Sequence, residues 1–343
     1  MIKEAITKLT NYENITFLEA SEAMTEIMSG QASPAQLSAF LIALRMKGET
    51  IDEISGCAQV MREKAEKVEL GTEDVIDIVG TGGDGANTIN ISTCSAFVVA
   101  GAGIPVAKHG NRSVSSKCGS ADVLEALGVN ISLLSLEAAQ CFQKTGLCFM
   151  FAPSYHTSMK YAAGPRKELG LRTIFNILGP LANPARVRNQ LLGVCDEKLV
   201  EPLTRTLANL GVKNAMTVSS HDGLDEISIS APTTVCELRE GRLTGYIIHP
   251  YQFGIQQCSL DEIRGGDVKE NAKIMKGILK GDITGPKREV VLLNSGAALY
   301  VAGKAQTIKE GLRLATLAID SGSAWQKLED YRACSHGLKE MSV

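Results

Sequence analysis

The sequence predicts an α/β protein with a small N-terminal helical domain and a large α/β domain built on a mostly parallel central sheet. Capped segments of helical periodicity fill residues 1 to about 70. From residue 75, short apolar strands alternate with helices, and glycine-rich or polar loops follow several strands directly. The chain has 343 residues, 44% of them hydrophobic, which is enough for two cores. We therefore expect domains at residues 1–70 and 71–343.

Helix signals are clear in the first domain. Residues 16–29 carry an apolar stripe that ends before Gly30, and Ser33-Pro34 begins a second helix. Thr50 and Glu53 form a capping box that opens a third. Helices near residues 165–190 are further candidates for this domain.

Strand signals define the second domain. We expect strands at 75–79, 104–107, 147–151, 190–194 and 215–218. A helix at 90–102 separates the first two, which favours parallel pairing. Residues 235–238 and 244–248 flank Glu240-Gly241 and indicate a hairpin near one edge. The last 60 residues are mainly helical, most clearly at 290–299 and 308–319.

Bulk composition argues against several classes of protein. The net charge of −3 and pI near 6.0 provide no basic field for nucleic acid. No apolar run approaches the ~20 residues that span a bilayer. The nine cysteines form no CxxC pair and follow no signal peptide, which indicates reduced intracellular thiols. We expect a soluble cytoplasmic protein with neither nucleic acid nor membrane as a partner.

The first candidate binding loop spans residues 80–93. A short strand runs directly into four glycines, and polar residues suited to a helix start follow. This order suits a backbone cradle for phosphate at the end of a strand. The loop matches neither a Walker A motif nor the dinucleotide GxGxxG pattern. A turn without a ligand is the alternative, and Asn90, Ser92 and Thr93 count against it by adding polar groups to the first helical turn.

The second loop spans residues 108–116. Lys108 can act as a point charge on phosphate, Asn111 can bond a neutral polar group, and Arg112 adds a second cation. Serines at 113, 115, 116 and 120, with Lys117, extend the polar cluster. The alternative is a solvated basic loop. His109 alone is more often structural than catalytic.

Acidic residues mark the third loop, at residues 219–226. Asp225-Glu226 is a common kind of surface pair, but at a strand end beside a phosphate site it fits Mg²⁺. The Ser92 hydroxyl could hold a second ion, as the Ser/Thr of a P-loop does. Elsewhere, Arg166 could receive a substrate carboxylate, with a helix-surface arginine as the equal alternative.

Five ordered motifs together resemble the anthranilate phosphoribosyltransferase family: residues 80–84 (GTGGD), 108–112 (KHGNR), 117–122 (KCGSAD), 172–181 (RTIFNILGPL) and 225–226 (DE). The resemblance covers nearly the whole chain. It implies transfer of the phosphoribosyl group of phosphoribosyl pyrophosphate (PRPP) to the amine of anthranilate in tryptophan biosynthesis. It also implies a large domain of the nucleoside-phosphorylase type, and a homodimer joined through the helical domain.

Carried over motif by motif, the resemblance implies PRPP ligands at Gly80, Gly83, Asp84, Thr88, Asn90, Ile91, Ser92, Thr93, Lys108, Ser116 and Ser120. It implies Mg²⁺, as two ions, at Ser92, Asp225 and Glu226, and anthranilate contacts at Gly80, Asn111 and Arg166. No residue stands out as a general base. One departure is Tyr155-His-Thr-Ser158, where the family usually has His-His-Pro-Ala, along the expected aromatic entry path.

The residues leave two alternatives open. A nucleoside phosphorylase of the same fold would use free phosphate and would lack the Arg166 carboxylate site. A related fold that binds nucleic acid would need a basic surface, which the net charge of −3 disfavours.

Overall fold

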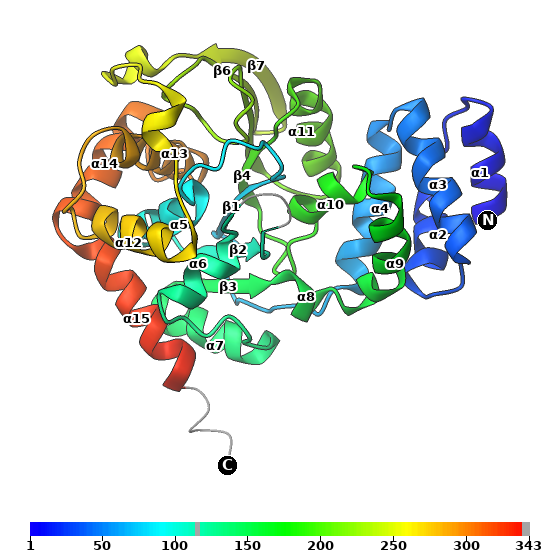
Figure 1. Cartoon of the computed structure of the whole chain (residues 1–343), viewed down its shortest axis with the longest axis horizontal. Helices are drawn as coiled ribbons and strands as arrows, with labels where there is room; N and C mark the ends of the chain where they lie inside the picture. Colours follow the sequence, from blue (N-terminus) through cyan, green and yellow to red (C-terminus); the bar gives the residue numbers. More distant parts are fainter. Residues whose placement is uncertain (114–116, 338–343) are drawn as a thin grey trace.

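A seven-stranded sheet organises the larger part of the molecule in the computed structural model, which describes residues 1–113 and 117–337 (Figure 1). The strand order is β3-β2-β1-β4-β5-β6-β7. The first five pair in parallel, and β6 and β7 add an antiparallel edge. Their bounds are β1 Ile76–Gly80, β2 Val106–Gly110, β3 Leu147–Phe151, β4 Asn189–Gly193, β5 Asn214–Ser220, β6 Thr233–Arg239 and β7 Arg242–Ile248. The predicted fold class is confirmed.

The end of the second strand differs from its prediction. The sequence predicts this strand at 104–107, but pairing of β2 with β3 continues to Gly110 opposite Phe151. Lys108 and His109 are therefore buried strand residues and not part of a loop. The charged side chain of Lys108 interrupts the apolar pattern, so hydrophobicity alone ends the predicted strand too early. The predicted hairpin is confirmed, with Glu240 and Gly241 both at positive φ between β6 and β7.

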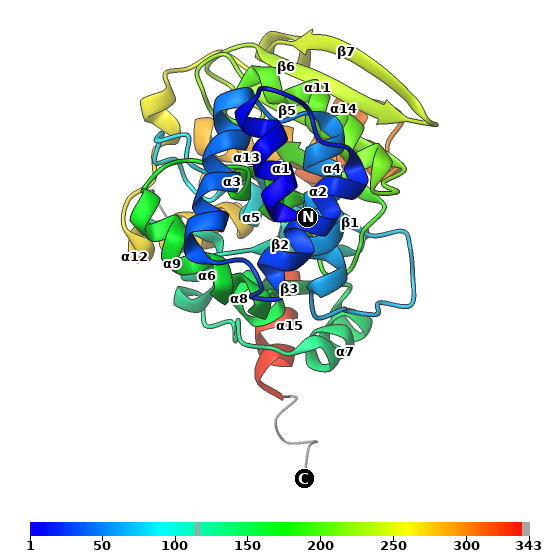
Figure 2. The same cartoon turned by 90° about the vertical axis from the view of Figure 1, so that its right-hand side faces the viewer.

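Four helices form an N-terminal bundle (Figures 1 and 2). They are α1 Ile2–Thr10, α2 Phe17–Met28, α3 Pro34–Lys47 and α4 Ile51–Lys64. Thr16, Ser33 and Thr50 each cap the following helix through a capping box. The helix starts at Ser33 and Thr50 are those that the sequence predicts.

A buried ion pair stabilises the bundle where α3 leads into α4. Lys47 Nζ lies 2.9 Å from Glu53 Oε2, and the two side chains are 5% and 0% exposed. Glu53 also accepts the backbone N–H groups of Ile15 and Thr50 at 3.0 and 2.8 Å. The bundle loop and both helices therefore depend on one carboxylate.

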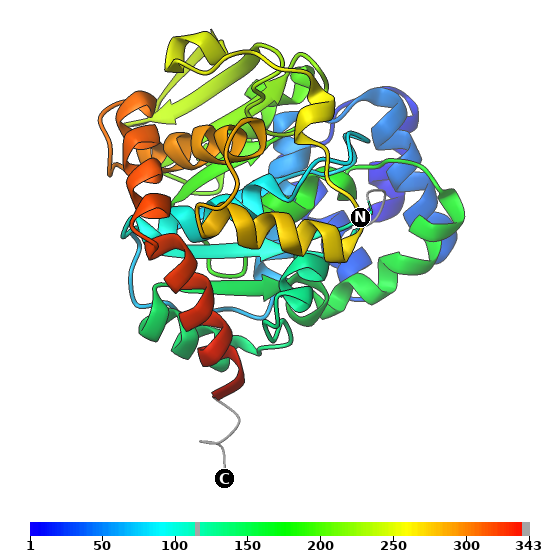
Figure 3. The same ribbon diagram turned by 60° about the vertical axis from the view of Figure 1, so that its left-hand side comes forward.

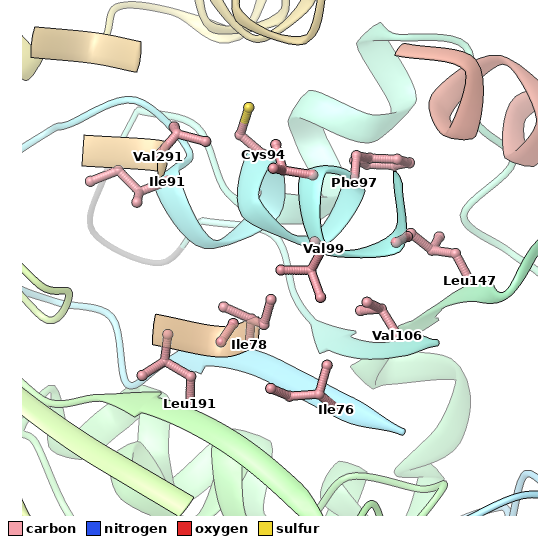
Figure 4. Packing of buried hydrophobic residues seen from close by; sticks show 14 of the residues in the cluster. Ile76, Ile78, Ile91, Cys94, Phe97, Val99, Val106, Leu147, Leu191 and Val291 are labelled. Atoms are coloured by element: carbon pink, nitrogen blue, oxygen red, sulfur yellow. The ribbon is translucent and has the colours of Figure 1, made fainter. Parts of the chain in front are cut away.

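The two faces of the sheet contribute to different cores. Ile76 and Ile78 of β1 lie beneath α5 Ile91–Gly101, whose Val99 points toward the strands (Figure 4). Leu191 of β4 belongs to this first core, which α13 Pro286–Val301 also covers. Leu192, the next residue, belongs to a second core on the other face. This alternation is what a strand buried on both faces requires.

The second core joins the N-terminal bundle to helices from the middle of the chain. It includes residues of α9 Lys160–Leu169, α10 Phe175–Leu181 and α11 Val200–Asn209. Arg62 of α4 donates to the carbonyls of Leu181 and Leu210 at 2.5 and 2.8 Å. Packing and buried polar bonds thus fix the bundle against the sheet.

The remaining helices lie around the first core and its edges (Figure 3). They are α6 Ser120–Ala126, α7 Ser135–Thr145, α8 Ala152–Tyr155, α12 Val268–Leu279, α14 Ile308–Asp320 and α15 Ser323–Gly337. None of the helices in residues 1–113 and 117–337 is long and apolar enough to cross a membrane.

Candidate active site

Asp225 lies between the carboxyl ends of β1 and β4. The register places Gly80 of β1 opposite Gly193 of β4. A Cβ at Gly80 would lie 2.3 Å from Asp225 Oδ2, and one at Gly193 would lie 1.6 Å from the Asp225 carbonyl oxygen. The backbone N–H of Gly82 donates to Asp225 Oδ2 at 2.6 Å. Two glycines thus make room for the acidic loop to contact the glycine loop, as the sequence predicts.

The glycine loop itself turns sharply after β1. Gly82, Gly83 and Gly85 all have positive φ, between 71° and 81°. Asp84 accepts the N–H of Ala86 at 3.1 Å, which closes the turn. Gly82 and Gly83 are exposed. Because the N–H of Gly82 already donates to Asp225, the backbone of Gly83 is the part accessible to a ligand.

Glu226 caps the helix that follows the glycine loop. Its Oε1 accepts the backbone N–H of Ser92 at 3.1 Å. The sequence predicts a backbone cradle for phosphate at this strand end, but the N–H of Ser92 does not contribute to it here, because a carboxylate of the chain occupies this N–H. Glu226 and Ser92 are nevertheless brought together, as a shared metal site would require.

Lys108 points from β2 toward the same place. Its ammonium donates to the Ile78 carbonyl and lies 3.3 Å from Ser92 Oγ, and the residue is only 4% exposed. Burial lowers the pKa of Lys108, while Asp77, Glu226 and Asp225 oppose that shift. The ammonium is thus held within the carboxylate cluster and not on the surface.

Both members of the acidic pair have raised pKa values. Burial raises the pKa of Asp225 well above its ordinary value, and the neighbouring Glu226 and Asp84 raise it further. Burial also raises the pKa of Glu226 to about 7, against the opposing effects of Lys108 and Ser92. A cation bound at these oxygens would favour the ionised form of both carboxylates.

The loop after β2 divides into two groups. Asn111 and Ser120 are linked, because Ser120 Oγ donates to the Asn111 carbonyl at 3.0 Å. Arg112, expected to add a cation for phosphate, instead pairs with Asp122 and Glu125, both at 2.9 Å. Both carboxylates lie on α6 and neutralise the guanidinium. Ser115 and the predicted ligand Ser116 lie outside the described residues.

The predicted ligands at the first turn of α5 differ from one another in exposure and in hydrogen bonding. The side chains of Ile91 and Thr93 are buried, at 2% and 1% exposure. Asn90 donates to the Cys118 carbonyl at 3.0 Å and accepts from Asn271 at 3.1 Å. Asn271 supports the site from α12, and no local signal in the sequence connects it to Asn90. Thr88 lies in an isolated bridge with Arg264.

Arg166 lies on α9 beside an aromatic ring. Its guanidinium carbon is 5.0 Å from the centre of the Phe175 ring, and burial lowers the pKa of the side chain. Within residues 1–113 and 117–337 no acceptor is recorded for this guanidinium. A half-buried arginine of this kind can receive a carboxylate in a fork.

A buried histidine pair contacts α10. His109 Nδ1 lies 3.2 Å from the Gly179 carbonyl, and the His109 and His156 rings are 5.0 Å apart. Burial lowers the pKa of His109 to about 3 and that of His156 to about 4. The departure at residues 155–158 therefore falls beside α10, the helix whose Phe175 contacts Arg166.

Two family models match the chain. A "Glycosyl transferase family, helical bundle domain" covers residues 3–65, and a "Glycosyl transferase family, a/b domain" covers residues 72–325. The chain is 54% identical to anthranilate phosphoribosyltransferase of Ruminiclostridium cellulolyticum over 340 residues, 99% of each sequence. It is 57% identical to the enzyme of Methanobrevibacter smithii over 331 residues, 96% of this chain and 98% of that one.

Solved structures agree with the sequence comparisons. The anthranilate phosphoribosyltransferase of Thermus thermophilus superposes with a TM-score of 0.92 at 39% identity, covering 96% of this chain and 99% of that one. The Saccharomyces cerevisiae enzyme in complex with PRPP and Mg gives 0.90 at 28% identity, covering 98% of each. The fold, the ordered motifs and these likenesses agree: the chain belongs to the anthranilate phosphoribosyltransferase family.

Proposed function

We propose that the edge formed by the ends of β1, β2, β4 and β5 binds PRPP and Mg²⁺, and that Arg166 and α10 present anthranilate to it. The family reaction transfers the phosphoribosyl group of PRPP to the anthranilate amine and releases pyrophosphate, in tryptophan biosynthesis. The observation that carries the site assignment is the contact of the Asp225-Glu226 pair with both the glycine loop and the start of α5.

The PRPP ligands are proposed along the glycine loop and the elements beside it. The exposed backbone of the loop suits the pyrophosphate. Ile91 and Thr93 have buried side chains, and the N–H of Ile91 already donates to the Ile89 carbonyl at 2.8 Å, so the backbone of Thr93 is the better placed of the two. Lys108 contributes a buried charge behind the loop. The full proposed set is Gly80, Gly83, Asp84, Thr88, Asn90, Ile91, Ser92, Thr93, Lys108, Ser116 and Ser120.

Mg²⁺ fits the acidic pair. Among the described residues no three His, Cys, Asp or Glu side chains converge as a ready cage. Mg²⁺ needs no such cage, because it takes one or two carboxylates and completes its shell with water and phosphate oxygens. Asp225 and Glu226 would hold it with Ser92, and we propose two ions across these three residues. Bound there, the metal would neutralise charge on the leaving pyrophosphate.

Anthranilate would lie against the first strand end. Arg166 would receive its carboxylate, and Asn111 and Gly80 would border the amine. The half-buried guanidinium, for which the described residues provide no acceptor, supports this orientation. The amine nitrogen would then approach ribose C1 from the side opposite the pyrophosphate.

The chemistry is a displacement with inversion at C1. The bond from C1 to the pyrophosphate oxygen breaks, the bond from C1 to the amine nitrogen forms, and the nitrogen releases one proton to solvent. An arylamine is neutral and nucleophilic at pH 7, so the chain needs no general base for the attack. Lys108 and the loop amides favour the departing anion, and fixed positions of both substrates supply the remaining acceleration.

Fluorescence of anthranilate tests this assignment. Addition of PRPP and Mg²⁺ to protein and anthranilate should abolish the signal as product forms. Arg166→Ala should raise the KM for anthranilate and leave the KM for PRPP unchanged. An equal loss for both substrates would contradict the role given to Arg166.

We extend the proposal to organisation and environment. The helical domain comprises residues 1–70, with the helices near 165–190 packed on it, and the catalytic domain residues 71–343. Exposed Tyr12, Phe17, Leu18 and Met46 on the bundle support a homodimer through this region. The nine cysteines, most of them buried, support a reducing cytoplasm. Sedimentation should give twice the mass of one chain, and Leu18→Glu should reduce it.

A further inference from the structure

Arg172 joins three parts of the molecule, and the proposed function leaves it without a role. Its Nη2 donates to the Gly82 carbonyl at 2.9 Å, and its Nη1 donates to Cys195 Sγ at 3.1 Å. Its own carbonyl accepts from the guanidinium of Arg45 on α3. The glycine loop after β1, the chain leaving β4 and the N-terminal bundle therefore meet at one residue.

The glycine loop is shaped around this guanidinium. A Cβ at Gly83 would lie 1.8 Å from Arg172 Nη2, so no larger residue fits there while Arg172 holds its position. Gly83 also has a φ of +81°, which other residues rarely adopt. Arg172 therefore packs directly on the backbone of the loop, at a position whose φ favours glycine.

The charge of Arg172 is available to an anion. Within the described part of the chain no carboxylate pairs with it, whereas the guanidinium of Arg112 pairs with two. A guanidinium carries five N–H donors, and the contacts with Gly82 and Cys195 use two of them. The side chain is exposed beside the loop, so the remaining donors can reach phosphate oxygens.

We propose that Arg172 binds the pyrophosphate of PRPP while it holds the glycine loop in its phosphate-binding form, and that Arg45 couples this contact to the N-terminal bundle. The inference rests on the proposed function, because it assigns a further residue to the same site. Negative charge grows on the pyrophosphate as its bond to C1 breaks, and the guanidinium stabilises that charge. A shift of the bundle moves the Arg172 backbone through Arg45 and so alters the loop.

Steady-state kinetics test the assignment with three variants. Arg172→Met should raise the KM for PRPP and the inhibition constant of product pyrophosphate, each roughly 10- to 100-fold, and lower kcat. The KM for anthranilate should change less than about threefold. Arg172→Lys keeps the charge and loses the fork, so it should recover part of the pyrophosphate affinity. Arg205→Met, a matched change at an exposed arginine of α11, should behave as wild type.

An unchanged inhibition constant for pyrophosphate in Arg172→Met would overturn the inference, as would equal increases in KM for both substrates. If Arg172→Met does not fold, the KM values and the pyrophosphate inhibition constant of Arg172→Lys test the inference instead. A double-mutant cycle tests the coupling: Arg45→Met and Arg172→Met should be non-additive in pyrophosphate affinity, since both act through one guanidinium. Additive effects would remove Arg45 from the proposal.

Calorimetry separates this inference from the function itself. PRPP with Mg²⁺ is titrated into wild type and into Arg172→Met in the absence of anthranilate. Arg172→Met should bind PRPP more weakly than wild type, by about the same factor as its KM for PRPP rises. If wild type fails to phosphoribosylate anthranilate but this difference persists, the proposed function fails and the role of Arg172 stands.

Discussion

Replacing Gly193 with alanine should damage the acidic site without touching any charged group. The added Cβ would lie 1.6 Å from the Asp225 carbonyl oxygen, and tight real contacts begin near 3.0 Å. β4 is fixed between β1 and β5 by register, so the loop carrying Asp225 must retreat by roughly 1.5 Å. A displacement of about 1 Å in a positioned group costs on the order of 100-fold in rate.

We therefore expect Gly193→Ala to lower kcat/KM about 100-fold and to raise the Mg²⁺ concentration needed for half-maximal rate. Overpacking should also lower the free energy of unfolding by about 1–3 kcal/mol. The assay is the initial rate of anthranilate consumption across a Mg²⁺ series, with urea unfolding in parallel. Gly245→Ala is the matched control, because Gly245 is a strand glycine whose Cβ would meet only the Val235 carbonyl, at 3.9 Å. Wild-type magnesium dependence in Gly193→Ala would refute the reasoning.

Three further predictions concern the carboxylates and the buried histidine. Asp225→Asn with Glu226→Gln should reduce magnesium-dependent turnover at least roughly 100-fold, and an unchanged magnesium profile would contradict the metal assignment. The pKa of His156 is lowered to about 4, so the unfolded chain binds more protons below pH 6.5 and stability falls as the pH drops toward 4. His156→Gln should flatten this slope by up to about 1.4 kcal/mol per pH unit in urea unfolding at pH 5 to 7, and an unaltered slope would exclude the histidine as its source. Glu53→Gln should lower the free energy of unfolding by about 3–5 kcal/mol, because it leaves Lys47 buried without its ion-pair partner. The double change Lys47→Met, Glu53→Gln should recover part of this loss. A loss below about 1 kcal/mol in Glu53→Gln would show that the pair is dispensable.

The sequence carried the signals that depend on local chemistry. Capping residues such as Thr50, the glycine loop and the turn at Glu240-Gly241 are each encoded within a few residues, and the structure confirms the elements that they predict. Strand ends were less visible, because the charged side chain of Lys108 interrupts the apolar pattern although it is buried.

Contacts between distant segments could not be read from local patterns. Nothing near Arg112 shows that Asp122 and Glu125 neutralise it, and nothing near Asn90 indicates Asn271. The capping of α5 by Glu226 depends on how two loops approach each other after the sheet forms. The order of the motifs along the chain identified the family, although these contacts between distant residues could not be predicted.

The bond from Gly82 to Asp225 has a kinetic consequence. It spans 143 residues, and β4, which separates the two loops in the sheet, must pair with both β1 and β5 before the bond can form. Long-range pairing of this kind is slow, because loop-closure entropy is lost before the contact rewards it. The first strand and its loop leave the ribosome long before their acidic partners, so a nascent chain would gain affinity for PRPP only after β5 has docked. Acquisition of ligand binding would then report pairing of the parallel strands β1, β4 and β5 more directly than the appearance of helix or strand signal does.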